Sequence, residues 1–384
     1  MGRRSNHGVH GVMLGAGDGT HNPSNLGVMG ERERNRCRQR LEALGDAHLG
    51  PDEARHTAIA ELRRAVGFDR WCWPLTDPDT GLATGGIGEF DFAPSLPRLV
   101  ALEEQGDVCC KPELIVGTRA SVALSAATRG DLARSPRWRE CLHPYGIGDE
   151  LMTACRDRHG CWGSVELMRD AGDRAFREED IRLLDTLAPT LGALVRRSVA
   201  RSWTADDVIP AAPPPGTLIL DGRLSSAAWT PALRDWLADL APGGAALPLA
   251  VFELGARVLT PPHSAHGLPP RVRLRAQSGR WSVIEGAPLE GGEPGRVAVT
   301  VRAATGDEVF DVLCKAHGFT ARERQLAALV RAGLATDRLA RAMRISPYTV
   351  QDHLKAIFAK TGLRSRRELV SHLVGHLAAG SNRA

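Results

Sequence analysis

The sequence predicts a multidomain α+β protein with two α/β units followed by an all-helical C-terminal module. Three observations point to this organisation. Short apolar strands alternate with amphipathic helices up to about residue 303, four prolines gather between positions 210 and 215, and the pattern beyond Asp307 is wholly helical. A chain of 384 residues is long enough for about two to four domains of ordinary size.

We expect the first α/β unit to span residues 29–203, after a disordered stretch at 1–28. Trp71 and Trp73 are expected on opposite faces of one strand, so that at most one of them could line a pocket. The expected elements, in order, are helices at 31–44 and 52–66, a strand at 70–75 that ends at the turn 77–81, a hairpin of strands at 150–156 and 161–168, and a helix at 178–197.

A proline-rich segment at 204–215 is expected to be a stiff, extended linker to the second α/β unit, residues 216–303. No internal repeat is evident in the sequence. The expected elements of the second unit are a strand at 217–221, a helix at 227–240 and strands at 271–277, 281–289 and 296–303.

Charge is spread unevenly along the chain. The formal net charge is +4, yet residues 315–372 hold twelve Lys and Arg against four Asp and Glu, a net of +8. The rest of the chain therefore sums to −4. A basic block on a slightly acidic body favours a C-terminal module that meets a polyanion.

The cysteines and the apolar runs indicate a cytoplasmic protein. None of the eight cysteines shows the paired Cys-x2-Cys spacing of a zinc site, and reduced thiols are expected. No apolar run is long enough to span a bilayer, and the N-terminus carries no hydrophobic secretory segment.

Several candidate sites are weak on inspection. Cys155, His159 and Cys161 stand on alternate strand positions and a hairpin tip, which rarely converge on a metal. The adjacent cysteines at 109 and 110 are expected to be buried small residues. His372 and His376 have no Glu between them, so the metalloprotease pattern is missing. With no phosphate-binding loop and no nucleophile elbow, an enzyme with a regulatory tail is only an alternative, and no catalytic residue or cofactor is identified.

The C-terminal module, expected at residues 304–378 before a tail at 379–384, contains a helix–turn–helix pattern. Thr320 and Glu323 have the spacing of a capping box. Helices are expected at 321–332, 337–343, 347–360 and 366–377, the third of them capped by Ser346 with Pro347 at its first position. In the third helix Val350, Leu354, Ile357 and Phe358 form an apolar arc, whereas Tyr348, Asp352 and Lys355 point away from it.

These residues resemble the LuxR-type helix-turn-helix through FTARER (319–324), LARAMRISPYTVQDHLK (339–355) and IFAKTGLRSR (357–366). The resemblance implies a homodimer that binds double-stranded DNA, with the fourth helix as a common dimer contact. Whether the fourth helix, the helix at 178–197 or both hold the dimer stays open. It assigns groove-facing positions to Gln351, Asp352 and Lys355, and phosphate-facing positions to Thr349, Lys360 and Arg364; Ser346 and Tyr348 lie at the same helix end. Asp352 departs from the basic or neutral residue expected there, and would have to accept from a cytosine or pair with Lys355.

The first unit resembles a GAF domain through GCWGSVELMR (160–169) and FREED (176–180). The second unit is weakly similar to a PAS fold through GTLILD (216–221) and Gly279-Arg-Trp281. The resemblance implies a transcriptional regulator whose GAF-like domain could take a small-molecule effector, and it leaves RNA polymerase open as a partner. A scaffold that uses both units without a ligand is the alternative, and the identity of any effector stays open.

Overall fold

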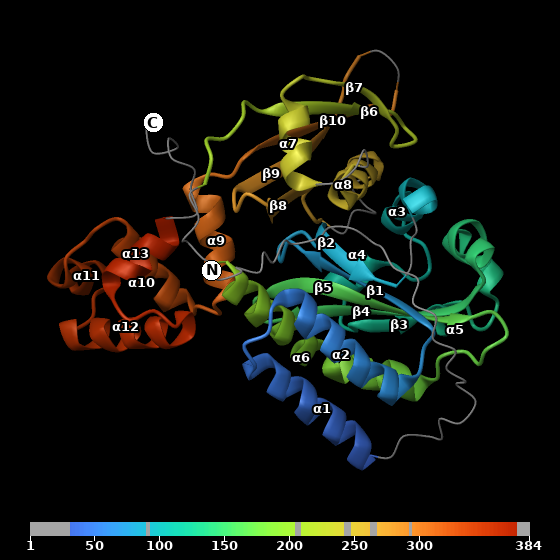
Figure 1. The fold of residues 1–384 in the computed structure, drawn as a ribbon, viewed down its shortest axis with the longest axis horizontal. Helices are drawn as coiled ribbons and strands as arrows, with labels where there is room; N and C mark the ends of the chain where they lie inside the picture. Colours follow the sequence, from blue (N-terminus) through green and yellow to red (C-terminus); the bar gives the residue numbers. More distant parts are fainter. Residues whose placement is uncertain are drawn as a thin grey trace, which may run out of the picture.

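The structure is a computed structural model that describes residues 31–89, 93–203, 209–241, 247–261, 267–291 and 294–374. The segments expected at 1–28 and 379–384, and part of the linker, lie outside the described residues. Two β-sheets lie one above the other, and the C-terminal helices pack beside them (Figure 1). The predicted multidomain α+β class is confirmed.

The first sheet is antiparallel throughout, in the order β2-β1-β5-β4-β3. The helices α1, α2 and α6 form a layer on one of its faces, below the sheet in Figure 1. The strands are β1 (Arg70–Thr76), β2 (Ala83–Gly88), β3 (Ser121–Ala123), β4 (Ile147–Asp157) and β5 (Gly160–Asp170), and the helices are α1 (Glu31–Asp46), α2 (Pro51–Val66), α3 (Leu96–Glu104), α4 (Lys111–Val116), α5 (Leu124–Ala127) and α6 (Glu178–Ser202).

The tryptophans of β1 belong to the apolar core between the first sheet and its helices. Trp71 and Trp73 are 1% and 0% exposed and belong to the same apolar cluster as the helical layer. The expectation that they lie on opposite faces is wrong, because side chains two positions apart on a strand share a face. The long helix α6 packs on this core with Leu184, Leu187 and Leu191.

The second sheet repeats the topology of the first. Its order is β7-β6-β10-β9-β8, again antiparallel, so both sheets read 2-1-5-4-3 when the strands are counted from the start of each unit. The repeat is in the fold and not in the sequence. The elements are β6 (Gly216–Leu220), β7 (Ser226–Trp229), α7 (Leu233–Leu240), α8 (Leu249–Leu259), β8 (Arg271–Arg275), β9 (Trp281–Pro288) and β10 (Val297–Ala303).

The helix expected at 227–240 is partly wrong. Its first residues form the edge strand β7, in which Trp229 pairs with Leu218 of β6, and the helix begins only at Leu233. Pro231 lies between the two elements, and a proline ring disrupts a continuous helix. The sequence pattern also missed α8, whose buried residues include Val251 and Leu254.

The described part of the proline-rich linker, residues 209–215, packs against the second sheet unit. The Trp236 indole donates to the carbonyl of Pro214 at 2.9 Å, and Arg280 donates to the carbonyls of Pro210 and Ala211 at 3.3 and 3.1 Å. These contacts fix the segment to the sheet that follows it.

The two sheet units share one interior. Helix α8 of the second unit lies against α3 of the first, and one apolar cluster includes residues of both, such as Val100 and Leu254. Ion pairs cross the same boundary: Arg257 pairs with Glu104 at 2.7 Å, and Lys111 with Glu253 at 2.9 Å. The two units are therefore joined by both apolar and charged contacts.

The C-terminal module follows β10 almost directly. Its first helix begins at a capping box between Thr305 and Glu308, and it shares an apolar cluster with Trp281 and Val283 of β9. The remaining helices form a small bundle at the side of the molecule (Figure 1). The helices are α9 (Gly306–Ala316), α10 (Ala321–Arg331), α11 (Thr336–Met343), α12 (Pro347–Thr361) and α13 (Arg366–Val374).

Candidate nucleic-acid interface

Local capping interactions set the helices of the candidate interface. Thr320 and Glu323 form a capping box at the start of α10, with Thr320 N–H donating to the Glu323 carboxylate at 2.7 Å. Helix α11 ends at Arg344, whose φ of 55° lies in the left-handed region. After this turn Ser346 caps α12 by accepting from the backbone N–H of Thr349 at 3.1 Å. The turn between α11 and α12 therefore takes only three residues, 344–346.

Helix α12 buries one face and exposes the other. Val350, Leu354 and Ile357 are buried in the core of the module. On the opposite side Tyr348 is 74% exposed, and Gln351, Asp352 and Lys355 are also exposed. The groove-facing residues implied by the resemblance thus lie together on the solvent side of α12.

Asp352 and Lys355 pair with each other on this exposed face. Lys355 Nζ lies 3.5 Å from Asp352 Oδ1, and the two side chains are 73% and 49% exposed. Pairs at this helical spacing are weak and screened by water. The pair therefore partly neutralises the carboxylate while leaving the lysine free to move to an incoming anion.

The resemblance gives Lys360 a phosphate-facing position, and in this structure its ammonium also has partners within the module. Its ammonium donates to Glu323 Oε2 at 2.5 Å and to the Gly318 carbonyl at 3.0 Å, so it ties the end of α12 to the start of α10. Burial alone would raise the pKa of Glu323, but the hydrogen bonds from Lys360 and Thr320 outweigh it and hold that pKa below its ordinary value. Lys360 therefore has an internal partner in this structure.

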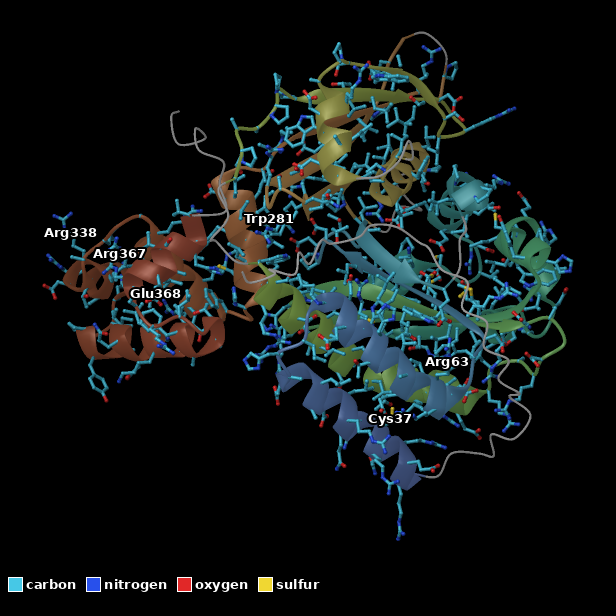
Figure 2. All side chains as sticks on the ribbon, viewed as in Figure 1. Cys37, Arg63, Trp281, Arg338, Arg367 and Glu368 are labelled. Carbon is cyan, nitrogen blue, oxygen red and sulfur yellow. The ribbon has the colours of Figure 1, made fainter. Side chains whose placement is uncertain are left out.

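The remaining residues surround the N-terminal half and the far end of α12. Thr349 is half-buried with its hydroxyl 2.9 Å from that of Ser346, and Arg364 is exposed just beyond the helix. Sequence reasoning missed Arg341 and Arg344, which with Ser346 line a shallow hollow at the turn between α11 and α12. Arg341 and Arg344 lie five and two residues before the cap Ser346, so their basic character next to the expected helix start could have indicated them. Exposed Arg338 and Arg367 extend the basic surface over the outer side of the module (Figure 2).

The side of the first sheet that faces α3 and α8 holds a buried set of charges. Lys111 Nζ lies 3.7 Å from Glu103, 3.9 Å from Glu166 and 2.9 Å from Glu253. Arg137, only 1% exposed, lies 2.5 Å from Glu150 and 3.6 Å from Glu103. Burial raises the pKa of Glu103 to about 7 despite these two cations. This part of the interior is thus filled by the chain's own polar side chains.

The cysteine and histidine candidates have separate surroundings. Cys155 and Cys161 are buried, and His159 accepts from its neighbour Arg158 at 3.0 Å. His372 lies 2.9 Å from His317 of the segment after α9, whereas His376 lies outside the described residues. Within the described ranges no group of three or more His, Cys, Asp or Glu side chains is arranged to hold a metal ion. No described helix is long and apolar enough to cross a membrane.

Comparison with known proteins identifies the C-terminal module. Residues 317–373 match the family of bacterial regulatory proteins, luxR family. The monoamine regulon transcriptional regulator of Klebsiella aerogenes is 48% identical over 52 residues, which cover 14% of this chain and 23% of that protein. An HTH-type transcriptional regulator of Aeromonas salmonicida is 43% identical over 58 residues, 15% of this chain and 30% of that protein. The chain thus matches less than a third of each relative, and the LuxR-type helix-turn-helix is confirmed for this module.

Solved structures similar to the larger part of the chain are distant. SdiA of Escherichia coli is 10% identical with a TM-score of 0.30, covering 89% of this chain and 97% of that one. The chromophore-binding domain of the bacteriophytochrome RpBphP3 from R. palustris is 17% identical with a TM-score of 0.28, covering 44% and 61%. Both TM-scores are too low to establish a shared fold.

Proposed function

We propose that the protein is a DNA-binding transcriptional regulator in which the helix-turn-helix reads the major groove of a two-fold site. The observation that carries this proposal is the exposed polar face of α12, which lies in the region that matches the luxR family. The major groove admits one α-helix, and a recognition helix reads bases mainly with its N-terminal half. In this chain that half presents Tyr348, Gln351 and Asp352, followed by Lys355.

Electrostatics supports the same proposal. The net charge of +8 over residues 315–372 attracts the phosphate backbone. Arg341, Arg344 and Arg364 are exposed around the two ends of α12, where phosphates flank a helix in the groove. We assign these arginines and Thr349 to the phosphate backbone, and Gln351, Asp352 and Lys355 to base edges. Lys360 is assigned to holding α12 in place.

The wider assembly is also proposed. A two-fold site requires two modules, so the protein is expected to act as a homodimer, with α13 as one contact. The two sheet units, proposed as a GAF-like domain at 29–203 and a PAS-like domain at 216–303, would sense a signal or dimerise. The helical layer of α6 is covered by α1 and α2 of its own chain, which leaves α6 poorly placed for a dimer contact. The same proposal includes RNA polymerase as a partner and a cytoplasmic location for the protein.

A second candidate is supported by one observation, the buried charges between the sheets. Lys111, Arg137 and their carboxylate partners occupy the side of the first sheet that an effector would be expected to use. The sheet units would then act as a scaffold without a small ligand. A thermal-shift screen distinguishes the two, because a true ligand at 100 times its Kd stabilises the folded chain by about 2.7 kcal/mol.

Lys355→Ala tests the DNA-binding proposal directly. If Lys355 contacts a base, the variant is expected to weaken specific binding by about 1–3 kcal/mol and to relax the sequence preference at one position. The measurement is a titration of duplexes that carry or lack the preferred site, with Arg98→Ala, on the surface of the first sheet unit, as the control. Unchanged affinity for both duplexes would show that Lys355 does not contact DNA.

A further inference from the structure

The turn between β1 and β2, residues 77–81, is held rigidly and reaches out of its own unit. Asp77 N–H donates to the Leu82 carbonyl at 2.9 Å, and Asp79 N–H donates to Asp77 Oδ1 at 2.9 Å. Asp77 is only 1% exposed. Arg257 of α8 donates to the Thr80 carbonyl at 2.7 Å, so the second unit already contacts this turn.

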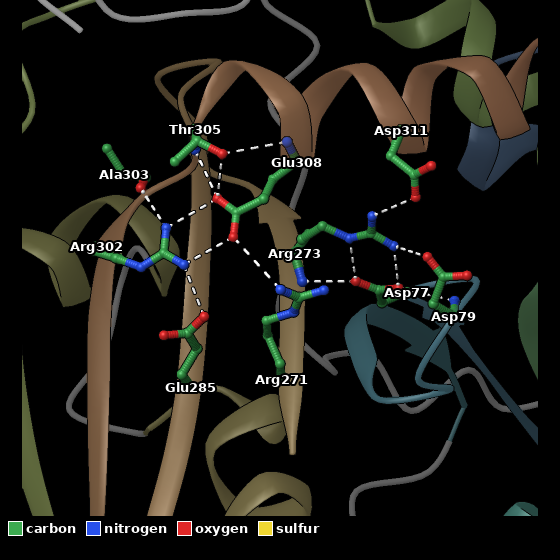
Figure 3. Close-up of polar contacts among 10 residues, drawn as sticks. All are labelled: Asp77, Asp79, Arg271, Arg273, Glu285, Arg302, Ala303, Thr305, Glu308 and Asp311. Atoms are coloured by element: carbon green, nitrogen blue, oxygen red, sulfur yellow. Dashed lines mark hydrogen bonds and ion pairs between the residues drawn. The ribbon is translucent and has the colours of Figure 1, made fainter. Parts of the chain in front are cut away.

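Arg273 of β8 binds the two carboxylates of the turn (Figure 3). It contacts Asp77 through its backbone N–H at 2.8 Å, through Nε at 2.9 Å and through Nη2 at 2.8 Å. Its Nη2 also donates to Asp79. The guanidinium matches two carboxylates at once, a geometry that only arginine provides.

Helix α9 completes the same cluster of charges. Asp311 accepts from Arg273 Nη1 at 3.1 Å, and Lys315, one turn later, pairs with Asp79. Arg324 of α10 lies 2.5 Å from the other oxygen of Asp311. We name this cluster the charged junction; its three carboxylates and three cations come from both sheet units and the C-terminal module: Asp77, Asp79, Arg273, Asp311, Lys315 and Arg324.

The two halves of the charged junction differ in exposure. The side chains of Asp77 and Arg273 are 1% and 3% exposed, so they form a buried ion pair between the two sheet units. Asp79 and Lys315 are 34% and 26% exposed. Their contact is partly hydrated, which makes it weaker and sensitive to salt.

Helix α9 contacts both sheet units. On the second sheet, Arg302 of β10 binds Glu308 at 2.8 Å, and Glu308 also lies 3.7 Å from Arg271 (Figure 3). Towards the first unit, α9 packs against α6, and its buried residue Ala316 belongs to the apolar cluster of that unit. Arg196 donates to the Ala316 carbonyl at 2.8 Å, and Lys315 pairs with Asp79. The Lys315–Asp79 pair is thus the partly hydrated contact among those that hold α9 against the first unit.

We propose that the charged junction orients the DNA-binding module, with Asp79 and Lys315 as positioning residues for the binding of a two-fold DNA site. This inference rests on the function proposed above. Two modules of a dimer bind both half-sites at once only when their separation and orientation match about one helical turn of DNA. A module that moves freely relative to the rest of the chain loses this freedom when the dimer binds the whole site, and the loss lowers the affinity. Binding of one half-site carries no such requirement.

The test is Asp79→Asn in the full chain, because it removes a charge shared by Lys315 and Arg273 while Asp77 still binds Arg273 and Asp311 still lies 3.5 Å from Lys315. The probes are a duplex with the two-fold site selected by the wild-type protein, and a duplex with one half-site beside scrambled sequence. We expect affinity for the two-fold site to fall about fivefold or more, with unchanged affinity for the half-site. Asp307→Asn is the matched control, since Asp307 lies on the same helix and its ion-pair partner among the described residues is Arg331, inside the module.

Hydrogen exchange of the same chains without DNA gives the second readout. The amides of α9 are expected to exchange faster in Asp79→Asn, with those of α12 unchanged and the control like the wild type. Equal losses on both duplexes, or wild-type exchange in α9 with unchanged affinities, would overturn the positioning role. A wild-type chain that binds no duplex contradicts the proposed function itself. Hydrogen exchange then still shows whether the Lys315–Asp79 pair holds α9.

Discussion

Two regions of this protein are rich in charge, and they use it in opposite ways. On α12 the charges face solvent, with Lys355 73% exposed beside Asp352. In the interior of the first unit Arg137 and Glu150 are each 1% exposed and lie 2.5 Å apart. Water screens the first kind of charge and leaves it available to an incoming polyanion, whereas the second kind must be satisfied within the fold. The location of a charge therefore distinguishes residues that meet partners from residues that hold the fold together.

The buried region also carries more acid than base. Around Lys111 and Arg137 lie Glu103, Asp107, Glu150, Glu166 and Glu253, contributed by different helices, strands and loops. Burial raises the pKa of two of these carboxyl groups, Glu103 and Glu166, although Lys111 and Arg137 oppose the shift.

The largest effect is expected from Arg137→Ala. The change leaves Glu150 buried without its cation and Glu103 with Lys111 alone, which is expected to cost about 3–5 kcal/mol of the free energy of unfolding. Denaturant unfolding of the full chain measures it. Arg98→Ala, which removes an exposed pair with Glu140, is the control and should change the stability little. Equal effects of the two variants would erase the distinction between buried and exposed charge.

A pH-dependent effect is expected at Glu103. Burial raises its pKa from 4.5 to about 7, with Lys111 and Arg137 opposing the shift and Glu166 and Glu150 adding to it. The folded chain then holds this proton more tightly than the unfolded chain, so the stabilisation is complete below about pH 4.5 and is lost as pH rises through about 7.

Glu103→Gln provides the measurement, since its amide cannot titrate. Between pH 4.5 and 7 the wild type is expected to lose stability relative to the variant, and the difference should level off at higher pH. Denaturant unfolding at a series of pH values follows this difference. A difference that stays constant over the whole range would show that folding leaves the pKa of Glu103 unchanged.

The smallest effect separates Lys360 from Arg364 at the end of α12. Lys360→Ala removes the contact with Glu323 and is expected to cost about 1 kcal/mol of stability, with an unchanged salt dependence of DNA binding. Arg364→Ala is expected to leave the stability alone and to reduce the salt slope by about 1, the signature of one lost phosphate contact. If Lys360→Ala reduces the slope instead, the lysine leaves Glu323 and contacts DNA.

The difference between these regions also explains how far sequence reasoning reached. The helices of the C-terminal module were predictable because their caps, Thr320 and Ser346, act within three residues of the helix start. The partner of Lys111 is Glu253, 142 residues away, and no local pattern links them. The same limit applies to Lys360, whose polar position was visible while its partner Glu323 was not. The repeated strand order stayed hidden because topology depends on strand pairing and not on a shared motif.

The most direct test of the central claim is selection of bound DNA from a random pool by the full-length protein at two salt concentrations. A LuxR-type module with an exposed α12 face is expected to enrich a two-fold motif, with half-site centres about one helical turn apart and affinity falling steeply with salt. A pool that shows no enrichment at either concentration, with no retained DNA even at low salt, would contradict DNA binding by this chain.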